Sequence, residues 1–332
     1  MSPDRGEYRR APQGLIGLRL KLLFFVVRWT VRLGLGGSAR QLVTQPIAQR
    51  KANKAAAWTT YPLPPDVAMA YHQIVARSGP LTLKKYRPPR LNPAAPRLLF
   101  LHGGGWVTGG VDTLDHLCAS LSRSAECEIF SVDYRLAPEA PFPGGLEDCY
   151  DALQWIAGDP SSGPLPRGGI AVMGESAGAN LAAALCVLNA RRNGPPIRHQ
   201  TLIYPCVDAT LSSPSMDNGP PGFRKSDIAQ LVDLYRGSAS LTDPLLSPLY
   251  AENHAELPQA LIITADLDPA RDDGDRYAQC LAAAGVPVRY LNYLGMPHGF
   301  FFMPRICRAE AEARAQINAA IVALSSDGHN VH

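Results

Sequence analysis

The stretch IAVMGESAG, residues 170–178, indicates how the middle of this chain folds. Its first four residues are apolar, as in a strand, and GESAG has the G-x-S-x-G form that places Ser176 on a tight strand-to-helix turn. Small residues flank the serine because such a turn is held in a sparsely allowed backbone conformation, where larger side chains would collide. An Ala-rich segment, residues 180–189, follows and indicates the helix. The stretch therefore predicts a serine with an exposed hydroxyl between the two elements.

A second glycine-rich string, HGGGW at residues 102–106, follows the apolar run at residues 98–101. A serine that attacks a carbonyl group needs backbone N–H groups to stabilise the negative charge that develops on the oxygen. A loop of successive glycines exposes such groups, because no side chain covers them. The two strings, in this order along the chain, point to acyl transfer through Ser176.

From about residue 60 onward, strand and helix signals alternate, which is typical of a mostly parallel sheet with helices on both faces. A hairpin that turns at Ser78-Gly79 is expected first. The expected strands cover residues 73–76, 81–86, 98–101, 128–132, 170–173, 201–204, 261–264 and 288–291. Helices are expected at residues 146–157, after a cap at Asp112, over residues 226–235 and from Pro304 onward.

Two stretches interrupt this alternation and are predicted to be cap segments that cover the site. One is the N-terminal stretch, residues 1–55, and the other is an insertion at residues 205–250. The insertion follows a strand and would lie above the carboxyl ends of the sheet, where α/β enzymes bind their ligands. The catalytic domain would then comprise residues 56–204 and 251–325, with a polar tail at residues 326–332.

A serine nucleophile needs a general base within hydrogen-bond reach and a carboxylate that orients the base. In α/β-hydrolases the acid and then the base follow the serine along the chain. His298 lies just after the last expected strand, in a loop that would carry it back over the serine, and is the strongest candidate for the base. His254, near the end of the insertion, is its rival.

The carboxylate is expected just after the strand at residues 261–264, where several aspartates lie close together. Asp268 precedes a proline, which stiffens the turn and suits a fixed carboxylate, and Asp266 is the competitor. Asp272 and Asp273 are better explained as the acidic start of the next helix, where negative charge interacts favourably with the helix dipole.

At these residues the chain resembles the hormone-sensitive-lipase family of α/β-hydrolases, also called the bacterial family IV esterases. Beside the two glycine strings, DYRLAPE at residues 133–139, DPARD at residues 268–272 and HGF at residues 298–300 are similar to motifs of that family. The resemblance extends over about residues 80–325. It implies an α/β-hydrolase fold, with a mostly parallel central sheet flanked by helices and a helical cap from the N-terminus and an insertion.

The resemblance also implies a role for each residue of the site. Ser176 would be the nucleophile, His298 the base and Asp268 the orienting acid. The oxyanion hole would comprise Gly103, which shapes the loop, and the backbone N–H groups of Gly104, Gly105 and Ala177.

Five further positions complete this comparison with the family pattern. Trp106 is expected to form a wall of the substrate pocket, and Glu175 either reaches that wall and alters acyl preference or has a structural role. Glu175 replaces the common Asp or Thr, and Ala270 replaces the usual leucine. Arg135 and Glu139, four residues apart in a turn, are expected to form a local ion pair that braces the loop.

Composition narrows the possible classes of protein. With 46% hydrophobic and 18% charged residues, the chain is typical of a soluble globular enzyme. Its seven cysteines are scattered without a paired motif, which indicates reduced, buried thiols and a cytoplasmic location. The sequence contains no metal-binding string of the H-E-x-x-H type and no phosphate-binding loop. We therefore expect no metal, no cofactor and no nucleic-acid partner.

The basic charge of the chain is concentrated at its front end, where residues 1–50 carry nine basic and two acidic side chains. Within it, residues 15–33 are predicted to form an amphipathic helix with Lys21, Arg28 and Arg32 on one side. Its longest uncharged run is far shorter than the roughly 20 residues that span a membrane. The helix is predicted to belong to the cap; alternatively, or in addition, it binds anionic lipid at a membrane surface.

The sequence thus predicts a serine carboxylesterase that hydrolyses short-to-medium acyl esters through an acyl-enzyme intermediate. An amide deacetylase or an acyltransferase would use the same parts, whereas a non-catalytic small-molecule receptor would keep the fold and lose the base. The presence of His298 within MPHGF favours catalysis over the receptor. The expected partner is a small ester substrate, and the sequence leaves open whether the protein is a monomer or a dimer.

Overall fold

The structure is a computed structural model that describes residues 7–10, 39–52, 58–159, 163–220 and 223–326. Its strands are β1 (Glu7–Arg10), β2 (Ala68–Ala76), β3 (Gly79–Arg87), β4 (Arg97–Leu101), β5 (Ile129–Val132), β6 (Ile170–Glu175), β7 (Ile197–Ile203), β8 (Gln259–Leu267) and β9 (Val288–Pro297). Its α-helices are α2 (Ala39–Leu42), α3 (Ile47–Lys51), α4 (Asp115–Ala125), α5 (Gly144–Gly158), α6 (Ala177–Arg191), α7 (Lys225–Arg236), α8 (Arg271–Ala283) and α9 (Ala309–Ser326). Short 3-10 helices are η2 (Pro214–Asn218), η3 (Pro248–Tyr250) and η4 (Phe300–Phe302).

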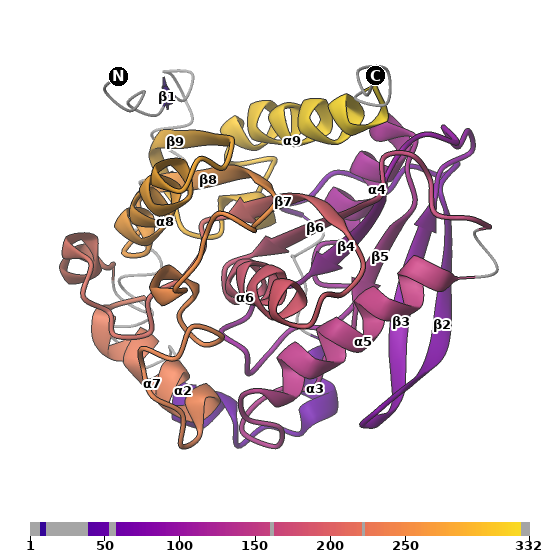
Figure 1. Cartoon of the computed structure of the whole chain (residues 1–332). Helices are drawn as coiled ribbons and strands as arrows, with labels where there is room; N and C mark the ends of the chain where they lie inside the picture. The colour runs from indigo at the N-terminus through magenta and orange to yellow at the C-terminus, as the bar shows by residue number, and fades with distance from the viewer. Residues whose placement is uncertain (1–6, 11–38, 53–57, 160–162, 221–222, 327–332) are drawn as a thin grey trace.

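The strands form one nine-stranded sheet in the order β1-β9-β8-β7-β6-β4-β5-β3-β2 (Figure 1). β3 is antiparallel to both β2 and β5, whereas every other neighbouring pair of described strands is parallel. The predicted mostly parallel sheet is therefore confirmed. The hairpin differs in its turn, which lies at Arg77 and Ser78, because Ala76 pairs with Gly79.

Helices cover both faces of the sheet and enclose two apolar clusters (Figure 1). The cluster on one face includes side chains of α5, α6 and α8, and the cluster on the other face includes side chains of α4 and α9. β4 contributes to both, with Leu99 and Leu101 in the first cluster and Leu98 and Phe100 in the second. Side chains alternate along a strand, so a strand buried on both faces is apolar throughout.

The front end of the chain adds a strand that the sequence analysis did not predict. β1 pairs in parallel with β9, Glu7 opposite Leu291 and Arg10 opposite Leu294. The prediction that the N-terminal stretch (residues 1–55) lies outside the strand–helix alternation is therefore wrong for these four residues. A short strand is held at a sheet edge by main-chain hydrogen bonds, which leave no apolar pattern in the sequence. The predicted helix over residues 15–33 lies outside the described residues, and its membrane contact stays a prediction.

Two helices begin later than predicted. Asp112 does not cap α4, which starts at Asp115. The Asp112 carboxylate instead lies 2.6 Å from Lys84 Nζ and accepts a 2.8 Å hydrogen bond from the Tyr71 hydroxyl. α9 starts at Ala309 rather than at Pro304, and the N–H of Arg305, in the turn before it, donates to the carbonyl oxygen of Thr59.

The state of the cysteines agrees with the prediction of reduced, buried thiols. All seven cysteines are free thiols, and all except the partly exposed Cys280 are buried. Among the described residues, no helix combines the length and the apolar character needed to cross a membrane.

Backbone packs closely against backbone at the junction between β6 and α6. A Cβ atom on Gly178 would lie 2.0 Å from the carbonyl oxygen of Leu101 at the end of β4. A Cβ atom on Gly174 would lie 2.1 Å from the carbonyl oxygen of Gly178 itself. Both glycines of the G-x-S-x-G string are therefore required by the close approach of backbone to backbone.

We predict that Gly178→Ala lowers the free energy of unfolding by about 3 kcal/mol, because the added methyl group collides with main-chain atoms that cannot move independently. Gly158→Ala is the matched control, since Gly158 lies in α5 with nothing within 4 Å of its Cβ position. That change should raise the free energy of unfolding by up to about 1 kcal/mol. Denaturant unfolding measures both, and equal midpoints for the two variants would contradict the prediction.

Candidate active site

Ser176 occupies a sharp turn between β6 and α6. Its φ of +55° lies in the left-handed region, which a residue with a side chain rarely adopts. The Ser176 N–H donates a 2.9 Å hydrogen bond to the carbonyl oxygen of Ile203 at the end of β7. The turn thereby places the side chain at the carboxyl ends of the parallel strands, directly before the N-terminus of α6.

Ser176, His298 and Asp268 come together in a hydrogen-bonded row. Ser176 Oγ lies 2.8 Å from His298 Nε2, and His298 Nδ1 lies 2.7 Å from Asp268 Oδ2. Asp268 is buried, and its Oδ1 accepts a 2.8 Å hydrogen bond from the N–H of Ala270. With Nδ1 donating to this carboxylate, Nε2 is free to accept the hydroxyl proton of Ser176.

Strand register explains why these distant residues meet. Leu267 of β8 pairs with Pro297 of β9, so Asp268 and His298 leave the sheet side by side. Parallel strands all end at the same edge, and Ser176 leaves β6 there as well.

Burial and neighbouring carboxylates act in opposite directions on the pKa of His298. Burial disfavours the protonated imidazole and lowers the His298 pKa, but the negative charge and hydrogen bond of Asp268 raise it, with a further contribution from Glu175. The net result is a pKa above the ordinary value of histidine. The imidazole is therefore a stronger base than a buried histidine without a carboxylate partner.

The rival histidine and aspartates make other contacts. His254 Nε2 lies 3.3 Å from the carbonyl oxygen of Pro248, and burial lowers its pKa. Asp266 faces Arg271, with 3.8 Å between Oδ1 and Nη1. Asp272 and Asp273 accept hydrogen bonds from residues of the insertion. Of the candidates weighed from the sequence, only His298 and Asp268 therefore lie in the row with Ser176.

The glycine loop (residues 102–106) follows β4, the neighbour of β6, where Leu101 pairs with Gly174. Gly104 and Gly105 have φ values of +116° and +60°. The carbonyl oxygen of Gly104 accepts hydrogen bonds from the N–H groups of Val107 and Thr108, at 3.2 and 3.1 Å. This turn leaves a run of glycine backbone next to the Ser176 turn.

Glu175 lies beneath the glycine loop rather than at an open pocket wall. It is buried, and a Cβ atom on Gly103 would lie 1.9 Å from Glu175 Oε2, which has no hydrogen-bond partner among the described residues. Burial raises the pKa of Glu175 to about 7, although the charge of His298 and polar groups of Tyr204 and Gly103 lower it. The alternative of a structural role is thus the one that the geometry favours.

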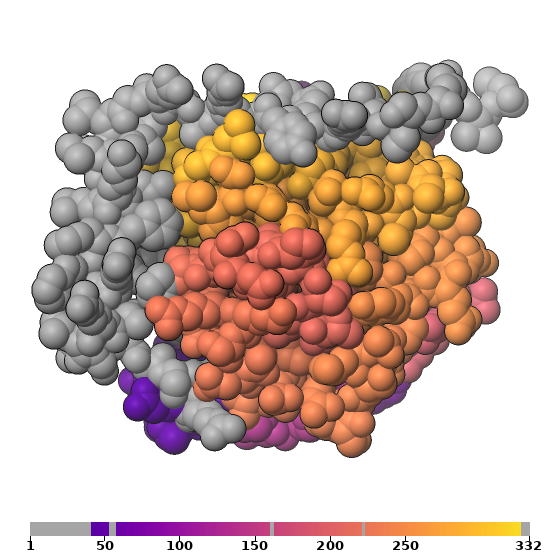
Figure 2. All heavy atoms as spheres, turned by 90° about the vertical axis from the view of Figure 1, so that its left-hand side faces the viewer, coloured from indigo at the N-terminus to yellow at the C-terminus, as the bar shows by residue number. Residues whose placement is uncertain are grey.

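The inserted segment (residues 205–250) places side chains against the site that were not singled out from the sequence. The Phe223 ring stacks on His298 with centroids 4.2 Å apart, and a Cβ atom on Gly105 would lie 2.7 Å from Leu231 Cδ1. Tyr235 stacks on Trp106 at 4.7 Å, with the rings parallel to within 1°. Figure 2 shows this segment, red to orange, at the surface of the left-hand side of Figure 1. Leu231 and Tyr235 belong to α7, and the amphipathic pattern of residues 226–235 is the sequence signal that could have identified them.

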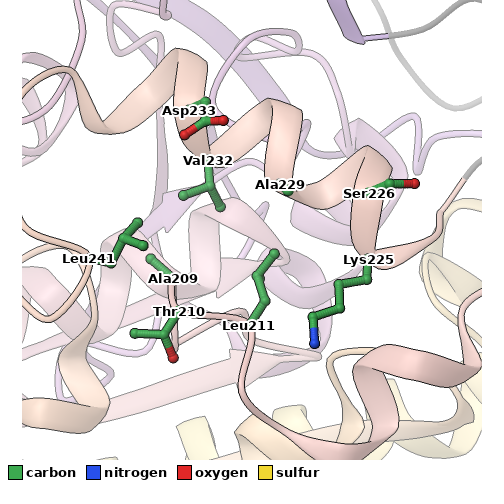
Figure 3. A pocket seen from close by; sticks show the side chains of 9 residues that line it. All are labelled: Ala209, Thr210, Leu211, Lys225, Ser226, Ala229, Val232, Asp233 and Leu241. Carbon is green, nitrogen blue, oxygen red and sulfur yellow. The ribbon is translucent and has the colours of Figure 1, made fainter.

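Helix α7 also borders a pocket of about 530 Å³ (Figure 3). The pocket is lined by Ala209, Thr210, Leu211, Lys225, Ser226, Ala229, Val232, Asp233 and Leu241. The lining positions on α7 recur at helical spacing on one face, and Leu231 falls on the opposite face. α7 therefore stands between this pocket and the glycine loop.

The predicted ion pair between Arg135 and Glu139 is wrong. Arg135 instead binds the carboxylate of Asp148 through two guanidinium nitrogens. Nε donates to Oδ2 at 2.8 Å, and Nη2 donates to Oδ1 at 2.9 Å. Asp148 lies in the second turn of α5, which begins just after this loop and brings its buried carboxylate to Arg135. Glu139 pairs with Arg50 of α3.

Within the described ranges, no group of three or more His, Cys, Asp or Glu side chains is arranged to hold a metal ion. The arrangement itself consists of a hydroxyl beside a basic imidazole, a carboxylate behind the imidazole, and partly exposed backbone at Gly104 and Gly105. Such a set suits the attack of an alcohol oxygen on a carbonyl group.

Comparisons with known proteins agree on the class. The sequence model of the α/β-hydrolase fold family matches residues 98–302. Esterase LipI of Mycobacterium tuberculosis is 38% identical over 79% of this chain and 83% of its own length. Carboxylic ester hydrolase LipN of the same organism is 41% identical over 74% of this chain and 67% of its own length.

Solved structures give the same result. Ester-hydrolase EH1AB1 from the metagenome of Lake Arreo, in complex with a bipyridine phosphonate derivative, superposes with a TM-score of 0.83 and 32% identity. The match covers 92% of this chain and 98% of that one. A hyperthermophilic esterase from Pyrobaculum calidifontis superposes with a TM-score of 0.74 and 33% identity, over 93% and 97% of the two chains.

We predict that Glu175→Gln lowers the pKa of His298, because the ionised carboxylate of Glu175 favours the protonated imidazole and the neutral amide does not. NMR titration of the His298 ring resonances measures this pKa directly. Glu252→Gln, at an exposed position, is the control and should leave the titration unchanged. An unchanged midpoint of the His298 titration in Glu175→Gln would show that the charge of Glu175 does not affect the pKa of the imidazole.

Proposed function

The chain belongs to the α/β-hydrolase fold family and is a carboxylic ester hydrolase, and we propose that it hydrolyses short-to-medium acyl esters through Ser176, His298 and Asp268. The names of its relatives support the reaction class. The hydrogen-bonded row from Ser176 Oγ through His298 to Asp268, at 2.8 and 2.7 Å, is the observation that carries the roles of these residues.

The first half of the reaction forms an acyl-enzyme. Ser176 Oγ attacks the ester carbonyl carbon while His298 Nε2 takes the hydroxyl proton, and the carbonyl electron pair moves to the oxygen. The N–H groups of Gly104, Gly105 and Ala177 stabilise this oxyanion, the last from the N-terminus of α6. When the intermediate collapses, the alcohol leaves with the proton that His298 held.

The second half returns the enzyme to its starting state. A water molecule gives a proton to His298 Nε2 and attacks the acyl carbon, and the oxyanion forms again in the same place. Collapse breaks the bond to Ser176 Oγ, which regains the proton, and the carboxylic acid leaves. Asp268 keeps the imidazole in the required tautomer through its bond to Nδ1 and stabilises the imidazolium in both halves.

The inserted segment supports the proposed chain length of the substrate. Leu231 lies against Gly105, Phe223 against His298 and Tyr235 against Trp106. These apolar groups close over the reacting atoms on the side of α7, so that a short or medium chain is easier to enclose than a long one.

We predict that Ser176→Ala reduces the turnover of p-nitrophenyl butyrate by at least about 1,000-fold, because the nucleophile is removed. Ser124→Ala is the control, since Ser124 is exposed and its hydroxyl donates only to the carbonyl oxygen of Leu121 in its own helix and to Asn318 Oδ1 of α9 among the described residues. Both variants should keep the thermal midpoint of the wild type.

A fluorophosphonate probe adds a readout that does not depend on the choice of ester. It should label the wild type and the Ser124 variant and leave the Ser176 variant unlabelled. Unchanged turnover in Ser176→Ala would overturn the proposed function. A wild type that neither turns over esters nor reacts with the probe would favour a non-catalytic receptor.

We predict that Leu231→Ala shifts the preferred acyl chain of p-nitrophenyl esters toward longer chains, because it removes the side chain packed on Gly105. The measurement is kcat/KM over a series from acetate to laurate. Asp233→Ala changes an exposed residue on the other face of α7 and should leave the order of the series as in the wild type. An identical order in Leu231→Ala would show that Leu231 does not limit the chain.

A further inference from the structure

Arg50 is a fully buried arginine at the end of α3, in the basic front end of the chain. Its Nη1 donates to two main-chain carbonyl oxygens, of Val107 at 2.7 Å and of Ala137 at 3.0 Å. Its Nε donates to the carbonyl oxygen of Gln45 at 3.3 Å, and Nη2 pairs with the half-exposed Glu139. The guanidinium thus joins three separate stretches of chain.

The main chain of α3 makes contacts with the same region. The carbonyl oxygen of Arg50 accepts hydrogen bonds from the N–H of Gly109 at 2.9 Å and from Thr108 Oγ1 at 2.6 Å. The next residue, Lys51, places its Nζ 2.7 Å from Asp133 Oδ2. α3 is therefore fastened to the segment that directly follows the glycine loop and to the DYRLAPE segment (residues 133–139).

The two residues whose carbonyl oxygens Arg50 binds are themselves hydrogen-bonded to the glycine loop. Val107, whose carbonyl oxygen Arg50 binds, donates its own N–H to the carbonyl oxygen of Gly104. Ala137, the other carbonyl partner, donates its N–H to the carbonyl oxygen of Trp106 at 2.9 Å. Arg50 consequently binds two residues whose N–H groups hydrogen-bond to the glycine loop: Val107, which bonds to Gly104, and Ala137, which bonds to Trp106.

A buried guanidinium group fixes the geometry of these contacts. A charge removed from water is tolerated only when its donors are satisfied, and the rigid fork of an arginine meets several acceptors at fixed angles. Loss of the side chain would leave the carbonyl groups of Val107 and Ala137 without these donors. The loop geometry, with positive φ at Gly104 and Gly105, would then lose its external support.

We propose that Arg50 is a positioning residue for the oxyanion hole, which holds the glycine loop so that the N–H groups of Gly104 and Gly105 point at the carbonyl oxygen of the substrate. The proposal rests on the proposed function. The oxyanion carries its full charge only near the transition state, so displacement of these donors lowers kcat more than it changes KM.

The test compares Arg50→Ala and Arg50→Lys with Arg192→Ala. Arg192 is the matched control because it pairs with Glu147 at the surface, between α6 and α5. Each variant is characterised by its thermal midpoint, by kcat and KM for p-nitrophenyl butyrate, and by the inhibition constant of a trifluoromethyl ketone, whose adduct with Ser176 mimics the oxyanion. Guanidinium chloride at millimolar concentration is then added to Arg50→Ala.

We expect Arg50→Ala to lose at least about 100-fold in kcat, the loss typical of one missing oxyanion donor, with KM changed by less than about threefold. Affinity for the ketone should fall by a similar factor, and guanidinium should restore part of kcat. Arg50→Lys should lose about tenfold, because an ammonium group cannot span both carbonyl oxygens. Arg192→Ala should match the wild type.

A folded Arg50→Ala with wild-type kcat and ketone affinity would overturn the proposal, as would a loss of kcat with unchanged ketone affinity. If the alanine variant does not fold, Arg50→Lys decides by the same two readouts. Failure of the proposed function is recognised separately, since the wild type itself would then show neither turnover nor labelling of Ser176.

Discussion

The left-handed backbone of Ser176 is the constraint on which the rest of the site depends. A residue with a side chain at φ +55° costs about 1–3 kcal/mol and persists only when its surroundings determine it. Here the hydrogen bond to Ile203 holds one side of the turn, and the contact of Gly178 with the backbone of Leu101 holds the other. The buried helix α6 begins at the next residue and fixes the backbone on that side. The orientation of the Ser176 hydroxyl is therefore restricted.

The same kind of strain recurs around the serine. Trp106 and Tyr204 also have positive φ, at +62° and +37°, and both have buried rings. Trp106 is held by the ring of Tyr235, and Tyr204 lies with its ring centroid 4.6 Å from that of His298. Strained positions thus border the site on the side of the glycine loop and on the side of the base. A stacked ring packs against Trp106, and tilted rings pack against Tyr204.

The segments outside the strand–helix alternation complete this arrangement. α3 fastens the chain beyond the glycine loop through Arg50, and α7 places Leu231 against Gly105. In addition, α2 contacts α7, so the N-terminal and inserted segments contact each other. The glycine loop is therefore held from below by the sheet, from one end by α3 and from above by α7.

The mostly parallel sheet, the serine turn and the order of Ser176, Asp268 and His298 could be predicted from the amino-acid sequence. These features are written in local patterns, because apolar runs, glycines at forced turns and residues just after a strand each report the backbone beside them. Three other features became visible only in the folded chain: Arg135 binds Asp148, Arg50 binds Val107, and β1 joins the edge of the sheet. Such partners are chosen by competition among groups brought together by packing, and no spacing along the chain records that competition.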